Sequence, residues 1–252
     1  MRIFNISSAG IIELTGLPAQ RPVAGYLWIA CDRSEFEASQ LQIQATLQAL
    51  CGMQLVDLHI SDLLNSQLPS NYDYTSQYDL LVFRRLTASD AGAGLVQPGQ
   101  PLVAPTKHSG PPILRRIDTS PVGFAVFDQV LLTVHPADCT IRDAYATKLL
   151  LSAGSTESRT GALRLPTSPA DLMLRIVAQM VDGYLDLRRE LTRQLDHWQV
   201  ELLAPHTRFS NWSALLEARL ALHQLDGICD DQRGAIQDWI AVLEDWPAPA
   251  TA

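Results

Sequence analysis

Short hydrophobic runs separated by polar turns occupy the chain up to about residue 151. Short apolar or alternating runs are typical of β-strands, whereas longer stretches with a 3.6-residue period are typical of helices. The pattern predicts strands over 2–5, 10–14, 26–30 and 78–86, with a hairpin of two more strands over 123–135 that turns at Asp128-Gln129. Helices are predicted over 34–51, 57–64 and 140–151.

The first predicted helix has recognisable signals at both ends. Ser34 and Glu37 have the spacing of a capping box, in which the hydroxyl and the carboxylate each bind a free backbone N–H group. Gly52 follows Cys51 and favours termination of the helix, because glycine adopts the left-handed conformation without steric cost. We therefore expect a helix of about five turns between these positions.

Two segments have the composition of connections. Residues 88–121 are rich in Gly and Pro and are too long for an ordinary loop, so a mobile or partly strand-forming excursion is expected there. The role of this excursion stays open. Residues 152–167 are rich in Ser, Thr and Gly, which is typical of a linker.

From residue 169 the period of the apolar positions becomes that of long helices. Ser168 is a favourable N-cap, Pro169 fits the first helical position, and Asp171 complements the helix dipole. Apolar residues on one face then predict a helix over 169–203: Met173, Val177, Met180, Tyr184, Leu187, Leu191, Leu195, Trp198 and Leu202. A second such set predicts a helix over 211–246: Leu215, Leu222, Leu225, Cys229, Ile236, Trp239, Leu243 and Trp246.

These elements predict an α/β (α+β) fold in two parts. Residues 1–160 form an α/β/α domain with a mixed sheet, and residues 161–252 form a long antiparallel helical hairpin. Each long helix has about 35 residues and a length of roughly 50 Å at the standard helical rise. Gly227 and Gly234 weaken the second helix, and Pro247 ends it.

Composition narrows the classes of function. The formal net charge of -8 and the lack of basic clusters argue against nucleic acid and anionic membrane surfaces as partners. No window of 18 to 20 residues is continuously apolar, and the first residues do not resemble a signal peptide, so a cytoplasmic location is expected. The four cysteines have no paired spacing and are interpreted as reduced core thiols: Cys31, Cys51, Cys139 and Cys229.

The residues that most often carry chemistry show no catalytic pattern. The histidines are scattered, with no i, i+4 pair: His59, His108, His135, His197, His206 and His223. Because no nucleophile elbow, Walker loop or dinucleotide fingerprint is present, we expect no enzyme, no catalytic residues and no bound cofactor. A soluble hydrolase is the least favoured class.

Charged and aromatic residues of the long helices are interpreted as structural and not as functional. Acidic residues that could line a cation route alternate with Arg188, Arg189 and Arg193, which favours a solvated, self-paired face: Asp182, Asp186, Glu190, Asp196 and Glu201. The tryptophans near the helical seam are interpreted as core packing: Trp198, Trp212, Trp239 and Trp246.

Four stretches, in order, resemble the cytoplasmic region of the CorA magnesium transporters and their zinc-transporting ZntB relatives. They are Tyr26-Leu27-Trp28-Ile29; Leu58-His59-Ile60-Ser61-Asp62-Leu63-Leu64 running to the strand that opens at Tyr78; Phe127 to His135; and Ala170-Asp171-Leu172-Met173-Leu174 running to Val181-Asp182-Gly183-Tyr184. Their order and the Val-Asp-x-Tyr segment in a long helix carry the resemblance.

The resemblance implies a soluble domain at the cytoplasmic face of the membrane, whose five subunits form a funnel that leads divalent cations, Mg²⁺ or Zn²⁺, to a pore. Family members continue into a stalk helix and two membrane helices with a Gly-Met-Asn signature. That part is absent from this sequence, and Gly52-Met53-Gln54 does not replace it. Whether Ala252 is the native C-terminus stays open. Selectivity in the family resides mainly in the pore, so the transported ion is not predicted.

Three positions depart from the magnesium-sensing members of the family. Where those members have acidic residues, this sequence has Ser76, Gln77 and Ala178. Since Mg²⁺ prefers carboxylate and water oxygens, these departures favour a ZntB-like or unregulated member, and the metal-binding residues stay unknown. An alternative function is a stand-alone oligomerisation or adaptor protein that binds partner helices through its hairpin.

Overall fold

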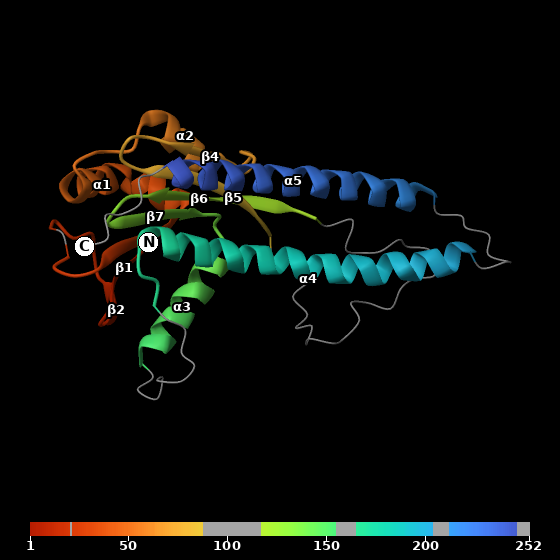
Figure 1. The fold of residues 1–252 in the computed structure, drawn as a ribbon, viewed down its shortest axis with the longest axis horizontal. Coiled ribbons are helices and arrows are strands. Elements are labelled where there is room, and N and C mark those ends of the chain that lie inside the picture. Colours follow the sequence, from red (N-terminus) through yellow and green to blue (C-terminus); the bar gives the residue numbers. More distant parts are fainter. Residues whose placement is uncertain (21, 88–116, 155–164, 204–211, 246–252) are drawn as a thin grey trace.

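The computed structural model describes residues 1–20, 22–87, 117–154, 165–203 and 212–245. Most of the predicted excursion over 88–121, much of the linker over 152–167, and the turn between the long helices lie outside these residues. Figure 1 shows a sheet at one end of the molecule and two long helices that extend away from it. The two long helices therefore project from the end of the molecule that contains the sheet.

Seven strands form one mixed sheet in the order β2-β1-β3-β7-β6-β5-β4. β3 and β7 are parallel, and the other neighbours are antiparallel. The strands are β1 (Arg2–Ser7), β2 (Gly10–Leu14), β3 (Tyr26–Asp32), β4 (Asn71–Tyr74), β5 (Asp79–Leu86), β6 (Thr119–Val126) and β7 (Val130–His135). The α/β class with a mixed sheet is confirmed, and β4 is an element that the hydrophobic pattern did not predict.

Helices cover both faces of the sheet. They are α1 (Arg33–Cys51), α2 (Asp57–Leu64), α3 (Thr140–Gly154), α4 (Pro169–Leu203) and α5 (Trp212–Asp245). On one face, α1 and α2 bury Phe36, Ile43 and Leu63 against the strands. On the other face, α3, α4 and the C-terminal half of α5 pack around Trp28, which is 0% exposed. The fold thus has three layers, because alternate residues of each buried strand point to opposite faces.

The N-terminus of α1 differs from the prediction. The N-cap is Asp32, whose Oδ1 accepts a hydrogen bond of 2.8 Å from Glu35 N, while the Glu35 carboxylate accepts one of 2.9 Å from Asp32 N. Ser34, the predicted cap, instead donates to Asp32 Oδ1 at 2.6 Å. The capping box was therefore placed two residues too late. The predicted stop is confirmed, since Gly52 is left-handed with φ of 82°.

The two long helices begin and end close to the predicted positions. Ser168 caps α4 as predicted, because its Oγ accepts a hydrogen bond of 3.1 Å from Asp171 N. The helices run antiparallel in Figure 1. Their sheet-proximal parts pack on the sheet, with Met180 and Trp239 in the same core as Phe83. The division of the chain into domains of 1–160 and 161–252 stays a prediction.

Beyond the sheet, α4 and α5 share a second, smaller core. It contains the buried residues Leu191, Trp198 and Ala218. The interpretation of Trp198 and Trp239 as core residues is confirmed, since they are 8% and 4% exposed. The predicted apolar seam extends further than this core does, because Leu195 and Leu202 are 40% and 38% exposed. The long helices are therefore held by two separate apolar cores along their length.

Candidate functional site

The positions that correspond to magnesium-sensing acids lie on two different elements. Ser76 and Gln77 form the exposed turn between β4 and β5, where Gln77 N donates to Thr75 Oγ1 at 3.2 Å. Ala178 lies on α4 and is exposed. None of these side chains is a carboxylate. Across the described residues, no group of three or more His, Cys, Asp or Glu side chains is arranged to hold a metal ion.

The acidic residues of α4 form the solvated face that was predicted. Asp186 pairs with Arg189 at 2.8 Å, and Glu190 pairs with Arg193 at 3.5 Å. Both pairs are spaced i, i+3 along the helix and are largely exposed, so their contribution to stability is small. Asp182 and Asp196 are also exposed, whereas the side chain of Glu201 lies outside the described part.

Both long helices bind the main-chain carbonyl of Arg84 on β5. Tyr184 of α4 donates its hydroxyl to Arg84 O at 2.9 Å. Gln232 of α5 donates its side-chain amide to the same oxygen at 2.6 Å. Burial raises the pKa of Tyr184, so the hydroxyl stays protonated and able to donate. We call these three residues, Arg84, Tyr184 and Gln232, the helix joint.

The helix joint exists because β4 is shorter than β5. β4 pairs with Asp79 to Val82 and leaves the outer edge of β5 without a strand partner from Phe83 onward. At this edge Arg84 N donates to Ser70 Oγ at 3.0 Å, and Arg84 O accepts from the two helices. Buried main-chain groups need such partners, because an unpaired carbonyl costs about 1–3 kcal/mol. Side chains of α4 and α5 thus complete the edge of the sheet.

The side chain of Arg84 makes further hydrogen bonds that hold this residue in place. Its guanidinium donates to Thr119 Oγ1 at 2.9 Å, to Thr119 O at 2.6 Å and to Leu68 O at 2.8 Å. These bonds connect β5 to the start of β6 and to the loop after α2. A movement of either long helix relative to the sheet would therefore act on a rigid strand and not on a loop.

A cleft of about 280 Å³ lies beside the helix joint, between α4 and α5. Its lining comes from β5, α4 and α5: Phe83, Val177, Val181, Cys229, Gln232, Arg233, Ile236 and Gln237. Cys229 is exposed here, so its interpretation as a core thiol was wrong. Cys31 and Cys139 are buried as predicted, and Cys51 is half-buried.

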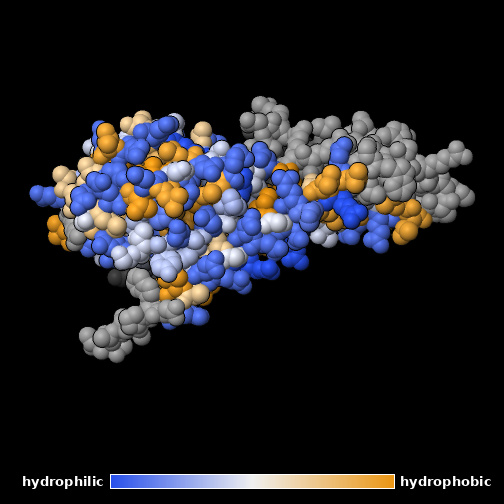
Figure 2. All heavy atoms as spheres, turned by 90° about the horizontal axis from the view of Figure 1, so that it is seen from above, coloured by the Kyte–Doolittle hydropathy of each residue, from blue (hydrophilic) through white to orange (hydrophobic). Residues whose placement is uncertain are grey.

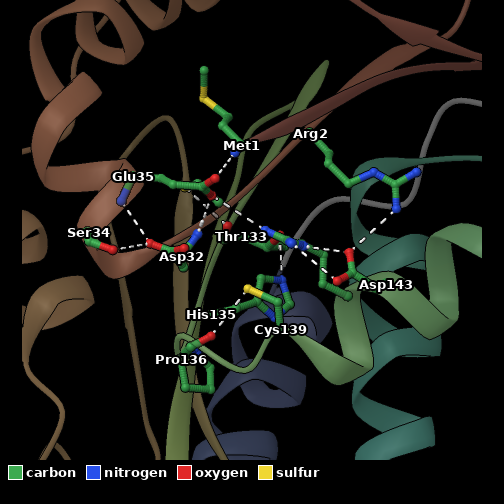
Figure 3. A network of polar contacts seen from close by, with 12 residues as sticks. Met1, Arg2, Asp32, Ser34, Glu35, Thr133, His135, Pro136, Cys139 and Asp143 are labelled. Carbon is green, nitrogen blue, oxygen red and sulfur yellow. Dashed lines mark hydrogen bonds and ion pairs between the residues drawn. The ribbon is translucent and has the colours of Figure 1, made fainter.

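A second polar region lies where the parallel strands β3 and β7 end (Figure 3). Glu35 accepts from Asp32 N and, at 3.4 Å, from Arg142, while Arg142 also contacts Asp143 at 3.0 Å. Arg2 reaches the same Asp143 at 3.4 Å. The network in Figure 3 therefore connects β1 and the N-terminal ends of α1 and α3 across the edge of the sheet.

His135 ends β7 within this region and is fully buried. Its Nε2 lies 2.9 Å from Thr133 Oγ1, while its Nδ1 has no partner in the described residues. Burial lowers the pKa of His135 to about 3, and the charges of Arg142 and Arg85 lower it too. Only one ring nitrogen of His135 therefore has a hydrogen-bond partner among the described residues.

His59 is the other buried histidine of the described chain, at 3% exposure. Its Nδ1 lies 2.6 Å from the Tyr78 hydroxyl, and its Nε2 lies 3.1 Å from Asp73 Oδ2. These contacts connect α2 to β4 and to the residue before β5, next to the turn with Ser76 and Gln77. Sequence analysis missed this connection, because none of the three residues has a motif spacing. His223 is exposed, and the side chains of His108, His197 and His206 lie outside the described part.

This chain shares its fold with solved soluble domains of CorA and ZntB, and sequence comparison points to the same family. The model of the family described as CorA-like Mg²⁺ transporter protein matches residues 25–251. The chain belongs to this family. A comparison with curated proteins found no match.

Solved structures share the fold at low sequence identity. Full-length CmaX superposes with a TM-score of 0.64 and 15% identity, covering 98% of this chain and 63% of CmaX. The soluble domain of CorA from Methanocaldococcus jannaschii gives 0.60 and 15%, covering 99% of this chain and 82% of that domain. The ZntB cytoplasmic domain from Vibrio parahaemolyticus gives 0.57 and 15%, covering 97% and 80%.

The chain corresponds to part of its complete relatives. It spans 63% of CmaX and 65% of the complete CorA magnesium transporter from Methanocaldococcus jannaschii. No helix in the described residues is long and apolar enough to cross a membrane. In Figure 2 the face seen from above mixes hydrophilic and hydrophobic residues over the sheet-bearing end.

The helix joint predicts a coupled loss of stability. Tyr184→Phe removes one donor to Arg84 O and is expected to lower the free energy of unfolding by about 1 kcal/mol. Gln232→Leu removes the other donor. Because the double variant leaves the carbonyl without either partner, its loss should exceed the sum of the single losses by at least about 0.5 kcal/mol. Urea denaturation measures this coupling, and Tyr74→Phe, at an exposed position, serves as the control.

His135 predicts a pH dependence of stability. The pKa is about 3 in the folded protein and near the ordinary 6.5 in the unfolded chain, so the unfolded state binds the extra proton between these values. The contribution of neutral His135 to the free energy of unfolding is therefore fully present above pH 6.5. It is lost as the pH falls toward 3. Between pH 7 and pH 5 the loss should be about 2 kcal/mol. Urea denaturation of His135→Gln should show a correspondingly flatter profile, and parallel profiles would contradict the assignment.

Proposed function

We propose that this chain is the cytoplasmic domain of a CorA-like membrane transporter of divalent cations, and that its role is non-catalytic. The observation that carries the proposal is the family match over residues 25–251. The fold shared with the soluble domain of CorA and with the cytoplasmic domain of ZntB supports it. The cations, Mg²⁺ or Zn²⁺, are cargo of the transporter and not resident cofactors.

Within the transporter, copies of this domain assemble into a homo-oligomeric funnel, a pentamer in the full-length protein. The net charge of -8 suits a cation entry path, because it raises the local concentration of divalent cations. The helix joint supports a gating role, since both long helices bind one main-chain atom of a rigid strand. A shift of the helix pair relative to the sheet is then a shift between two discrete packings.

The full-length protein tests the proposal. The coding sequence downstream of residue 252 should contain two apolar segments of about 20 residues with Gly-Met-Asn between them. The full-length protein in liposomes should take up Mg²⁺ or Zn²⁺ faster than empty liposomes, as measured with an enclosed fluorescent indicator. A coding sequence without such segments would contradict the proposal and favour the stand-alone oligomerisation or adaptor protein.

The departures at Ser76, Gln77 and Ala178 predict a weak response of this domain to Mg²⁺. Carboxylates are missing at all three positions, so millimolar Mg²⁺ should change neither the oligomeric state in sedimentation nor the rate of cleavage by trypsin. The variant Ser76→Asp, Gln77→Asp, Ala178→Asp restores acidic side chains and is the matched comparison. Strong Mg²⁺-dependent protection of the unmodified chain would contradict the prediction.

A further inference from the structure

One carboxyl group of the sheet lies beneath a long helix. Asp79 is the first residue of β5, and the alternation of the strand points it to the same face as Leu81 and Phe83. Leu81 and Phe83 belong to the apolar core to which α5 contributes Trp239. The side chain of Asp79 is half-buried on this face, at the contact between β5 and the C-terminal half of α5.

Two donors reach the Asp79 carboxylate from different elements. The Tyr72 hydroxyl of β4 donates to Asp79 Oδ1 at 2.9 Å. The side chain of Trp239 on α5 forms a further hydrogen bond to the carboxyl group, and an indole ring can only donate. Trp239 is itself buried. The Asp79 carboxylate thus connects β4, β5 and α5 at one point.

This contact is a second attachment of α5, separate from the helix joint. Gln232 donates to Arg84 O, and Trp239 lies seven residues further along α5 on the same face of the helix. The acceptor in the helix joint is a main-chain carbonyl, which does not titrate. The second attachment contains a carboxyl group, so its strength depends on whether that group carries a proton.

The environment of Asp79 disfavours its charged form. Burial raises the pKa of Asp79 above its ordinary value, although the hydrogen bonds from Tyr72 and Trp239 lower it in part. The carboxylate therefore loses more hydration under α5 than the two donors replace. If α5 moved away, the carboxylate would be hydrated again and its pKa would return toward the ordinary value. The packed arrangement of α5 thus binds a proton on Asp79 more tightly than a released arrangement does.

Asp79 is the group that can change its charge at this contact. Tyr72 faces it from β4, and burial raises the pKa of the Tyr72 hydroxyl, which stays neutral in acid. Trp239 faces it from α5 and does not titrate, and the residue paired with it on β6 is apolar. Of the nearby acids, Asp73 of β4 is bound to a histidine of α2, and Asp238 of α5 is exposed.

We propose that Asp79 is a proton-linked latch for α5. Protonated Asp79 favours packing of the C-terminal half of α5 on β4 and β5, and ionised Asp79 favours its release from the sheet. The cost of burying the charge acts in full above the pKa of Asp79 in the packed arrangement, and it disappears as the pH falls through that pKa. By the same linkage, a movement that lifts α5 releases a proton. The latch belongs to the folded domain and does not depend on transport.

Hydrogen exchange of the whole chain, followed by mass spectrometry, tests the direction of this linkage. Asp79→Asn keeps the size of the side chain and an acceptor oxygen but cannot ionise, so it mimics the protonated latch. At pH 7.5, peptides from the C-terminal half of α5 should therefore exchange more slowly in Asp79→Asn than in the unmodified chain. At pH 5 this difference should shrink, because Asp79 takes up protons. Since His135 is present in both proteins, comparison at one pH cancels its effect.

Nuclear magnetic resonance reports the protonation itself. The indole N–H signal of Trp239, assigned by its loss in Trp239→Phe, should move in one step as the pH falls from 7.5 and should stay fixed in Asp79→Asn. Tyr72→Phe removes a donor that lowers the pKa of Asp79, so the midpoint of the step should shift to higher pH. This titration uses the unmodified chain and decides the question even if Asp79→Asn fails to fold.

An exposed acid next to Trp239 supplies the matched control. Asp238→Asn removes the same charge from the surface of α5 and should keep the pH response of the unmodified chain in both measurements. Exchange in Asp79→Asn that is equal to or faster than in the unmodified chain at pH 7.5 would overturn the latch. A Trp239 signal that ignores pH, or that titrates equally in Asp79→Asn, would overturn it as well.

Discussion

The arrangement of the long helices depends on one atom, the main-chain carbonyl oxygen of Arg84. The pairing of β4 along β5 stops at Val82, so the sheet alone leaves the main-chain oxygen of Arg84 without a strand partner. Tyr184 and Gln232, which are far apart in sequence, both donate to it. An apolar core lies on each side of this point, one on the sheet and one between the outer parts of α4 and α5. The joint thus sets the register between the helix pair and the sheet, which apolar packing alone specifies only loosely.

Charge is distributed unevenly over the molecule. The chain is acidic as a whole, and exposed acidic residues of α4 pair with arginines along the helix. At the edge where β3 and β7 end, burial and the charges of nearby arginines lower the pKa of Arg33 and of buried His135. The two regions lie on different parts of the fold. Net charge alone would not have indicated the second region.

Local sequence signals predicted the bounds of an element correctly where only one nearby residue suited the boundary. The helix over 57–64 and the strand over 10–14 have the predicted bounds. β4 was missed because Asn71-Tyr72-Asp73-Tyr74 has no apolar period; its pairing depends on β5, where Asp79 accepts from the Tyr72 hydroxyl at 2.9 Å. The capping box was misplaced because Asp32 and Ser34 both suit an N-cap, and only the end of β3 decides between them.

The sequence by itself determined the class of fold, the two long helices and the resemblance to the CorA family, since these follow from local periodicity and from ordered segments. Tertiary structure decided the rest. Tyr184 belongs to the segment that carried the resemblance, yet its partner on β5 lies 100 residues away. Arg33 reads as an ordinary residue at a helix start, and only strand order brings it near Arg84 and Arg85. Contacts between distant residues depend on how strands pair and layers pack, and local patterns contain no information about either.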